Sequence, residues 1–302
     1  MELGVFTFGS RLASIVEDAE RAEREGFALF AMANIAGHDA IGALTVAGTR
    51  TSRIRLATGV VPTFPRHPTT MAQQALTAQA ASGGRFTLGV GLSHQISIEG
   101  GYGLSFDRPA VHMREYLSVL LPLLRGEPVQ FEGTQYRVRA ALRTPDAPPV
   151  RCLIAAMAPV MLKLAGSMAD GTILWMTGAR AVAGHIVPRV TRAAAEAGRP
   201  APEVVCMLPI ALTADPAEAH RRAAAQFENY GRLPSYRAML DREGVAGPGD
   251  VALVGDEAAL RQQLGRLRDA GVTTFAGGAF DDGSGSLERT RAFLAAEVAA
   301  YR

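Results

Sequence analysis

The sequence predicts a closed barrel of eight parallel strands surrounded by helices, the α/β architecture known as the (β/α)₈ or TIM barrel. Three observations lead to this prediction. Eight short apolar runs alternate with helical patterns, which is typical of repeated βαβ units. The length of 302 residues suits one such barrel, and eight strands in one chain favour a closed barrel over an open sheet. The composition, 48% hydrophobic and 20% charged, is that of a globular protein. We therefore expect a single domain over residues 1–302.

The eight predicted strands are spread along the whole chain. Each is short and rich in β-branched or aromatic residues, and most are bounded by glycine, proline or polar residues. They cover residues 3–8, 27–33, 54–61, 86–92, 150–157, 172–176, 204–212 and 272–280.

The intervening segments carry helical patterns with recognisable ends. Residues 11–25 repeat apolar side chains at helical spacing, and residues 69–82 form an alanine-rich pattern after a proline. Both segments stop at glycine, as helices often do. Asp256 is placed to cap a further helix over residues 257–270.

Two intervals are too long for a plain strand–helix unit. Residues 93–149 contain a loop, a helix over 110–125 and the segment VQFEGTQYRV, which predicts a hairpin turning at Glu132-Gly133. Residues 213–270 contain two or three helices. Long insertions at the carboxyl-terminal face of a barrel usually shape its active site, so we expect both insertions to contribute.

Several familiar barrel chemistries are disfavoured by the residues at the predicted strand ends. A Schiff-base aldolase needs a lysine there, but Lys163, the only lysine, lies one turn into the helix after strand five. The six histidines are dispersed, which disfavours a metal site, and no metal ligand set is predicted. Strand seven ends in Leu208-Pro209-Ile210 and offers no carboxylate for a glycosidase. This elimination leaves redox chemistry on a bound cofactor.

Charge and composition also limit the partners. The net charge is +2 and no basic run with interleaved aromatics occurs, so we expect no nucleic acid partner. No signal peptide and no apolar stretch of membrane-spanning length is visible, so the expected location is the cytoplasm, with no membrane partner. Cys152 and Cys206 lie in apolar runs and are interpreted as buried hydrophobic residues. The expected partner is a small-molecule substrate.

Three segments carry the functional signal, and each also has a purely structural interpretation. The loop from Thr58 to Pro68 follows strand three, where glycine permits close approach of a ligand; it is otherwise a stiff loop. In SGGRFTLGVGLSHQ, His94 follows strand four as a general acid or base, or as a histidine that hydrogen-bonds a loop backbone. Ala155 to Pro159 offers free N–H groups to a phosphate, or is ordinary helix packing. A rival phosphate site is Gly277-Gly278 after strand eight.

Together these segments resemble the luciferase-like family of flavin and deazaflavin oxidoreductases. The loop after strand three and SGGRFTLGVGLS have the spacing usual in that family. The similarity is closer to the branch dependent on coenzyme F420, a deazaflavin, and it covers most of residues 1–180. It rests on GHDAIGALTVAGTRTSRIRLATGVVPTFPRHP, LSHQISIEGGYGLSFDRPAVHMREYL and LAGSMADGTILWMTG.

The resemblance implies a barrel with an insertion after strand four, a cofactor across the carboxyl-terminal mouth, and a homodimer. It also implies a non-prolyl cis peptide at the end of strand three, at Thr58–Gly59 or Gly59–Val60. The expected cofactor is F420, with FMN as the alternative. The cofactor-binding residues implied are Thr58, Gly59, Val60, Val61 and Ser93, with the cofactor phosphate on the backbone of Ala156, Met157 and Ala158.

The sequence departs from the deazaflavin dehydrogenases in two segments. Asn34-Ile35 stands where those enzymes tend to carry Asp-His, and His94 stands where they tend to carry glutamate. The set needed to oxidise an alcohol is incomplete, which favours reduction of an activated C=C or C=N bond.

The expected reaction is hydride transfer between the deazaflavin C5 carbon and a small organic substrate. His94 is the predicted catalytic proton donor, and Asn34 is expected to orient the cofactor or substrate. Two alternatives remain: an FMN-dependent luciferase-like monooxygenase, and a flavin-binding barrel without turnover. The predicted substrate-binding residues are Phe6, Phe8, Tyr102, Arg108 and Trp175.

Overall fold

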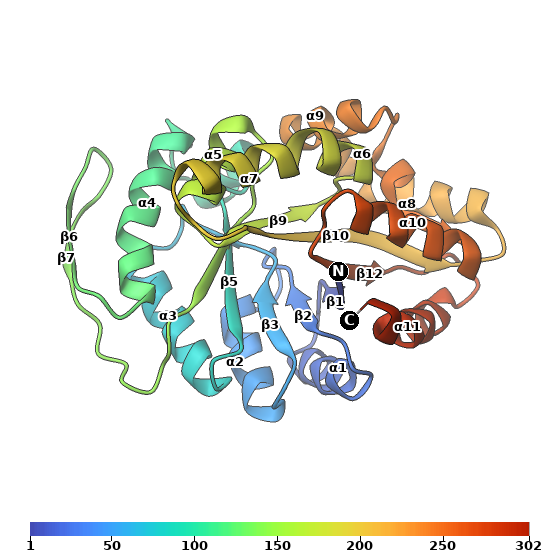
Figure 1. The fold of residues 1–302 in the computed structure, drawn as a ribbon, viewed down its shortest axis with the longest axis horizontal. Helices are drawn as coiled ribbons and strands as arrows, with labels where there is room; N and C mark the ends of the chain where they lie inside the picture. The colour runs from blue at the N-terminus through green and yellow to red at the C-terminus, as the bar shows by residue number, and fades with distance from the viewer. Residues whose placement is uncertain (302) are drawn as a thin grey trace.

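A closed barrel of parallel strands forms the centre of the protein, as the computed structural model of residues 1–301 shows (Figure 1). Neighbouring strands pair in parallel register around the barrel, and β12 pairs with both β1 and β10 to close it. The predicted barrel is confirmed. Its eight strands are β1 (Glu2–Thr7), β2 (Leu29–Met32), β3 (Arg55–Thr58), β5 (Phe86–Gly91), β8 (Arg151–Ile154), β9 (Gly171–Trp175), β10 (Glu203–Leu212) and β12 (Thr274–Ala279).

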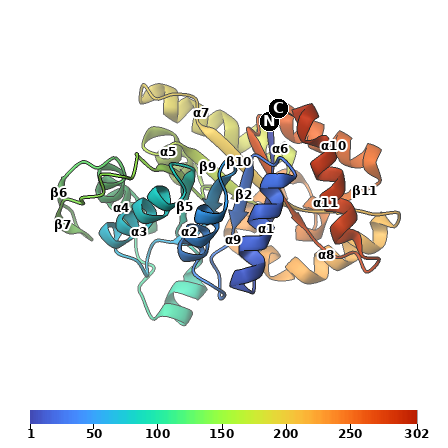
Figure 2. The ribbon, with the colours of Figure 1, turned by 90° about the horizontal axis from the view of Figure 1, so that it is seen from below.

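The helices lie outside the strands, as the two perpendicular views show (Figures 1 and 2). Buried leucine, isoleucine and alanine side chains on their inner faces pack against the sheet. The Asp256 carboxylate accepts a hydrogen bond from the Ala259 N–H and caps α10, as predicted. The outer helices are α1 (Leu12–Arg24), α2 (Ala40–Arg50), α3 (Pro68–Ala81), α5 (Pro159–Ser167), α7 (Val187–Glu196), α10 (Glu257–Asp269) and α11 (Ser286–Glu297).

The first insertion follows β5 and ends in a hairpin at one edge of the molecule (Figure 1). The predicted turn at Glu132-Gly133 is wrong, because Glu132 is still paired with Arg137 and the turn spans residues 133–136. The buried Glu115 carboxylate accepts hydrogen bonds from the backbone N–H groups of residues 134, 135 and 136, which stabilises this longer turn. The insertion comprises a π-helical turn (Ile96–Gly101), α4 (Pro109–Leu124), β6 (Val129–Glu132) and β7 (Arg137–Ala140).

The second insertion follows β10 and lies over the carboxyl ends of the strands. Strand seven, predicted over residues 204–212, is confirmed as β10, and its last residues Ile210, Ala211 and Leu212 pair with the short strand β11. Within residues 1–301, no helix combines the length and apolar character needed to cross a membrane. The insertion contains α8 (Pro216–Gly231), α9 (Pro234–Glu243), a 3₁₀ turn (Pro248–Val251) and β11 (Leu253–Gly255); α6 (Ala179–Ala181) and a π-helical turn (Val182–Ile186) precede α7.

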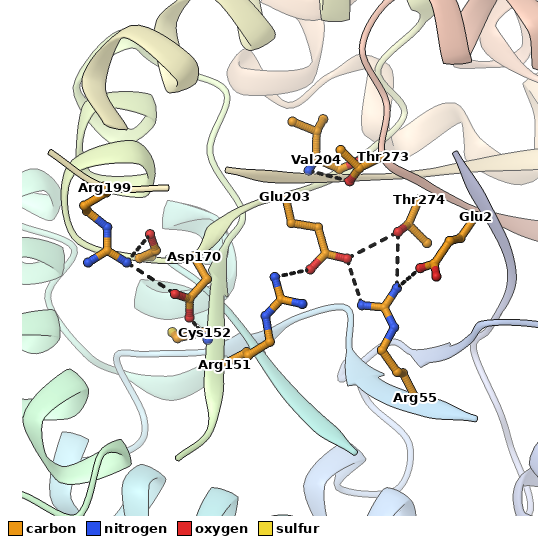
Figure 3. A network of polar contacts seen from close by, with 11 residues as sticks. Glu2, Arg55, Arg151, Cys152, Asp170, Arg199, Glu203, Val204, Thr273 and Thr274 are labelled. Carbon is orange, nitrogen blue, oxygen red and sulfur yellow. Dashed lines mark hydrogen bonds and ion pairs between the residues drawn. The ribbon is translucent and has the colours of Figure 1, made fainter. Parts of the chain in front are cut away.

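A charged network joins the amino-terminal ends of strands that are distant in the sequence (Figure 3). Glu203, at the start of β10, is 8% exposed and has an ion pair on each carboxylate oxygen. Its partners are Arg55 of β3, at 2.9 Å, and Arg151 of β8, at 2.8 Å. Arg55 also pairs with Glu2 of β1. One carboxylate therefore links β3, β8 and β10 across the bottom of the barrel.

Replacing Glu203 with Gln is expected to lower the free energy of unfolding by about 3 kcal/mol, because two guanidinium groups lose their buried counter-charge. Urea denaturation followed by circular dichroism would measure the change. The matched control is Glu228→Gln, which removes an exposed ion pair with Arg232 and should cost at most about 1 kcal/mol. Equal small effects of the two substitutions would show that the network does not stabilise the barrel.

Candidate active site

A cavity of about 940 Å³ opens at the carboxyl ends of the barrel strands. Residues at or just after these strand ends supply most of its wall, and the second insertion covers one side. This is the position at which barrel enzymes bind their ligands. The lining residues include Phe6, Phe8, Asn34, Gly59, Val60, Ser93, His94, Tyr102, Ala155, Ala156, Met157, Trp175, Met207, Gln226, Asn229, Tyr230, Leu233 and Tyr236.

Strand β3 is interrupted at the cavity. It ends at Thr58, and pairing with β5 resumes only at the short strand β4 (Val61–Pro62). Between them the Gly59–Val60 peptide bond is cis, at one of the two bonds that the family resemblance implied. Gly59 and Val60 line the cavity, whereas Thr58 and Val61 are buried behind them.

Thr58 and Gly89 hold this interruption in place. The Thr58 hydroxyl donates to the Gly89 carbonyl at 2.8 Å and accepts from the Gly89 N–H at 2.9 Å. A β-carbon at position 89 would lie 2.0 Å from the Thr58 carbonyl oxygen, and one at position 91 would lie 2.8 Å from the Val60 side chain. The two glycines of β5 therefore provide the space into which Thr58 and Val60 pack.

His94 is the one imidazole among the lining residues. Its ring centroid lies 5.5 Å from that of Tyr236, and neither ring nitrogen has a hydrogen-bond partner within residues 1–301. The structural interpretation, a histidine that hydrogen-bonds a loop backbone, is therefore wrong. Burial lowers the pKa of His94 below its usual value, so the imidazole is mostly neutral at pH 7.

Asn34 also lines the cavity, and its side-chain carbonyl oxygen is already hydrogen-bonded within the protein. Its carbonyl oxygen accepts a hydrogen bond from the Ala40 N–H at 2.9 Å and stabilises the loop before α2. The side-chain NH₂ has no partner in the described part of the chain and remains available to a ligand.

The segment between β8 and α5 offers backbone donors at the cavity edge. Ala155, Ala156 and Met157 line the cavity, whereas Ala158 is exposed outside it. No residue from 1 to 301 accepts a hydrogen bond from the N–H groups of Ala156, Met157 and Ala158. The Met157 carbonyl is fixed by the ring Nε2 of buried His185 at 2.7 Å.

The rival phosphate site at Gly277-Gly278 is not placed as predicted. Both glycines are buried within β12 and do not follow it. A β-carbon on Gly277 would lie 2.9 Å from both the Ile210 and Leu294 side chains. Gly277 therefore permits close packing of β12 against α11, and Gly278 lies against Phe6 and Trp175 of neighbouring strands.

Of the predicted substrate residues, Phe6, Phe8, Tyr102 and Trp175 line the cavity, but Arg108 does not. Arg108 precedes α4 with a positive φ of 45°, and its exposed side chain pairs with Asp107. Its left-handed backbone conformation and this pairing leave the guanidinium outside the lining.

The second insertion supplies wall residues that sequence reasoning missed. Gln226, Asn229 and Tyr230 come from α8, Leu233 follows it, and Tyr236 comes from α9. Positions 226, 229, 230 and 233 share the spacing of one helix face, which was the only sequence signal for them.

Helix α4 of the first insertion packs against the loop that follows β4. The His112 ring of α4 stacks on Phe64, with centroids 3.8 Å apart and planes 4° apart. The His112 Nε2 and the Thr63 hydroxyl are hydrogen-bonded at 2.9 Å. Burial lowers the pKa of His112 to about 4, so the ring packs as a neutral aromatic. This contact couples α4 to the rim of the cavity.

The cavity wall carries no formal charge. None of the residues lining it within the described chain is Asp, Glu, Lys or Arg, so its polar character comes from amides, hydroxyls, backbone groups and one imidazole. Across residues 1–301, no group of three or more His, Cys, Asp and Glu side chains is arranged to hold a metal ion.

Residues 1–278 match the family model of the luciferase-like monooxygenases. The chain belongs to this family. A protein of Mycobacterium tuberculosis described only as uncharacterized is 32% identical over 288 residues, covering 90% of this chain and 81% of its own length. The F420-dependent glucose-6-phosphate dehydrogenase of Intrasporangium calvum is 30% identical over 273 residues, covering 84% of this chain and 80% of its own.

Solved structures share the same fold. The F420-dependent tetrahydromethanopterin reductase of Methanopyrus kandleri superposes with a TM-score of 0.84 at 21% identity, covering 99% of both chains. The oxygenating part of 3,6-diketocamphane monooxygenase of Pseudomonas putida, in complex with FMN, gives a TM-score of 0.78 at 18% identity, covering 99% of this chain and 98% of its own. The predicted luciferase-like barrel and its likeness to F420-dependent proteins are confirmed.

Replacing Gly89 with Ala is expected to lower the free energy of unfolding by about 1–3 kcal/mol or more, because the new methyl group meets the Thr58 backbone. Thermal or urea unfolding would measure the effect. Gly265→Ala is the matched control: a β-carbon there meets nothing within 4 Å, and alanine should stabilise α10 by up to about 1 kcal/mol. If the two substitutions have the same effect, the close approach at Gly89 does not constrain the site.

Proposed function

We propose that this protein is an F420-dependent oxidoreductase, acting as a reductase of a small organic substrate. One observation carries the proposal: Gly59 and Val60, at the break between β3 and β4, line the same cavity as Ala156 and Met157, whose N–H groups have no acceptor within residues 1–301. A relative that matches most of the chain is named as an F420-dependent dehydrogenase, and this supports the choice of cofactor.

The cavity fits a deazaflavin. Its volume of about 940 Å³ suits a tricyclic ring with a side chain. Val60, which lines the cavity between β3 and β4, would support one face of the ring, and Ser93 would hydrogen-bond its polar edge. The phosphate would lie on the N–H groups of Ala156, Met157 and Ala158 at the start of α5, where aligned backbone dipoles favour an anion.

The residues of the cavity favour reduction over alcohol oxidation. Bound F420 supplies a hydride and takes part in two-electron chemistry. Removing an alcohol proton requires a base held in place; His94 is the one side chain of the wall that could accept the proton, and no carboxylate lines the wall to orient it, so the set expected of an alcohol dehydrogenase is incomplete. We propose that an activated C=C or C=N bond receives the hydride, that the Asn34 amide orients the reactants, and that His94 supplies the proton.

An FMN-dependent monooxygenase is the second candidate, because a structure with the same fold contains FMN. Titration of the purified protein with each oxidised cofactor, followed by fluorescence, separates the two. We expect saturable binding of F420 at least about tenfold tighter than that of FMN, a difference of about 1.4 kcal/mol. Tight FMN binding without F420 binding would overturn the proposal.

A pH profile tests the role of His94. If its imidazolium is the proton donor, kcat should rise about tenfold per unit as pH falls from 8, until the pH reaches the lowered pKa. His94→Gln should flatten the profile and lower kcat by about 10²-fold or more. His38→Gln, at an exposed histidine outside the lining, is the control and should behave as the wild type. An unchanged profile in His94→Gln would assign the proton to another group.

A further inference from the structure

A row of aromatic rings forms one wall of the cavity and joins three segments of the chain. The ring of Tyr236 lies 5.5 Å from His94 and 5.0 Å from Tyr230. Tyr230 lies 6.1 Å from Trp175, which in turn lies 5.0 Å from Phe6. Phe6 is within 3.5 Å of the β-position of Gly59. The row therefore extends from the cis peptide to His94.

Trp175 carries an unused hydrogen-bond donor. The residue is 8% exposed, and its buried indole N–H has no acceptor at hydrogen-bond distance within residues 1–301. A buried donor without a partner costs free energy, so its retention requires a reason.

The phenol of Tyr230 lies next to the Trp175 indole in the row of rings. Burial raises the pKa of the Tyr230 phenol, and the indole of Trp175 opposes that rise from the neighbouring ring, 6.1 Å away between centroids, although its N–H lies beyond hydrogen-bond distance of the phenol. The phenol has no acceptor of its own in the described chain, so its O–H is free to donate toward the cavity. A phenol that receives positive potential from an indole becomes a better donor.

Tyr236 offers a second free phenol in a less suitable place. It is more deeply buried than Tyr230, and burial raises its pKa well above the usual value. No indole supports it. It also lies one ring farther from Phe6 and the cis peptide.

The uncharged wall limits which acceptor groups can bind beside the Tyr230 phenol. Apart from His94 when it is protonated, the wall offers no counter-ion, so a charged group placed beside Tyr230 would lose its hydration without gaining a partner charge there. The acceptor of the hydrogen bond is therefore a neutral oxygen, and the surrounding rings favour a flat, conjugated molecule.

We propose that Tyr230 donates a hydrogen bond to the carbonyl oxygen of an uncharged, conjugated ketone or aldehyde, and that Trp175 positions the Tyr230 phenol. The inference rests on the proposed function and names its substrate class. Reduced F420, when bound, would supply a hydride from its C5–H bond to the β-carbon; as the new C–H bond forms, the C=C bond shifts to join the α-carbon to the carbonyl carbon, and the carbonyl π pair moves onto the oxygen. Tyr230 stabilises this enolate, and a proton from His94 at the α-carbon completes the saturated product.

The test uses cyclohexenone labelled with carbon-13 at the carbonyl, bound to protein that holds oxidised F420. Isotope-edited infrared spectroscopy then reports the carbonyl stretch, which falls in frequency when the oxygen accepts a hydrogen bond. We expect a shift to lower frequency in the wild type, loss of most of it in Tyr230→Phe, a partial loss in Trp175→Phe, and no change in the matched control Tyr236→Phe.

Four results would overturn the inference. They are an unchanged shift in Tyr230→Phe, a shift lost in Tyr236→Phe, and a labelled enone that fails to bind or is displaced by cyclohexene carboxylate, its charged analogue. Because the measurement needs binding and not turnover, a normal shift without any reduction of the enone would contradict the proposed function while the hydrogen bond stands. Where reduction occurs, Tyr230→Phe should lower kcat by about 10²-fold or more, with a small change in KM.

Discussion

The candidate site depends on the close approach of Thr58 to Gly89. The Thr58 carbonyl occupies the volume where any other residue at position 89 would carry a β-carbon, and the Thr58 hydroxyl bonds both backbone groups of Gly89. Strand β3 can therefore stop one residue before the cis peptide without leaving the sheet. Val60 then packs over Gly89 and Gly91, and pairing resumes at Val61. This packing requires glycine at positions 89 and 91 of β5. The segment FTLGVGL therefore forms a barrel strand and also provides the space that Thr58 and Val60 occupy beside the cavity.

The charged network and the candidate site lie at opposite ends of the barrel. At the amino-terminal end, Glu203 with Arg55 and Arg151 places opposite charges in a partly buried network that joins separate strands (Figure 3). At the carboxyl-terminal end, the cavity wall has no formal charge. Charges that stabilise the fold are therefore kept away from the site, where they would compete with a ligand for hydrogen bonds and shift its electrostatics.

The parts of this arrangement that were predictable follow local rules. Apolar runs and capping residues such as Asp256 predicted the strands and helices to within a few residues, because they reflect backbone hydrogen bonding and burial nearby in the sequence. Gly59, Ser93 and His94 were placed at the mouth because parallel strands end at one face. Tyr230 and Tyr236 were not predicted to line the cavity, because helical periodicity shows which side of α8 and α9 is apolar but not which barrel loops that side covers. The hairpin turn was misplaced for a similar reason: its length depends on Glu115, 18 residues before Gly133.

The uncharged wall also explains how the two ends of a deazaflavin would be treated differently. Its phosphate would be held by the backbone N–H groups of Ala156, Met157 and Ala158, since no lysine or arginine lines the cavity among the described residues. Such donors do not attract anionic substrates over long distances as a cationic side chain would. The ring of the proposed cofactor would meet Val60, Phe6 and Trp175, apolar side chains of the cavity wall that would exclude water and strengthen each remaining hydrogen bond. In such a wall the hydrogen bond of the Tyr230 phenol and the proton of a His94 imidazolium are screened less than in water, so the proposed chemistry depends on the positions of these two groups.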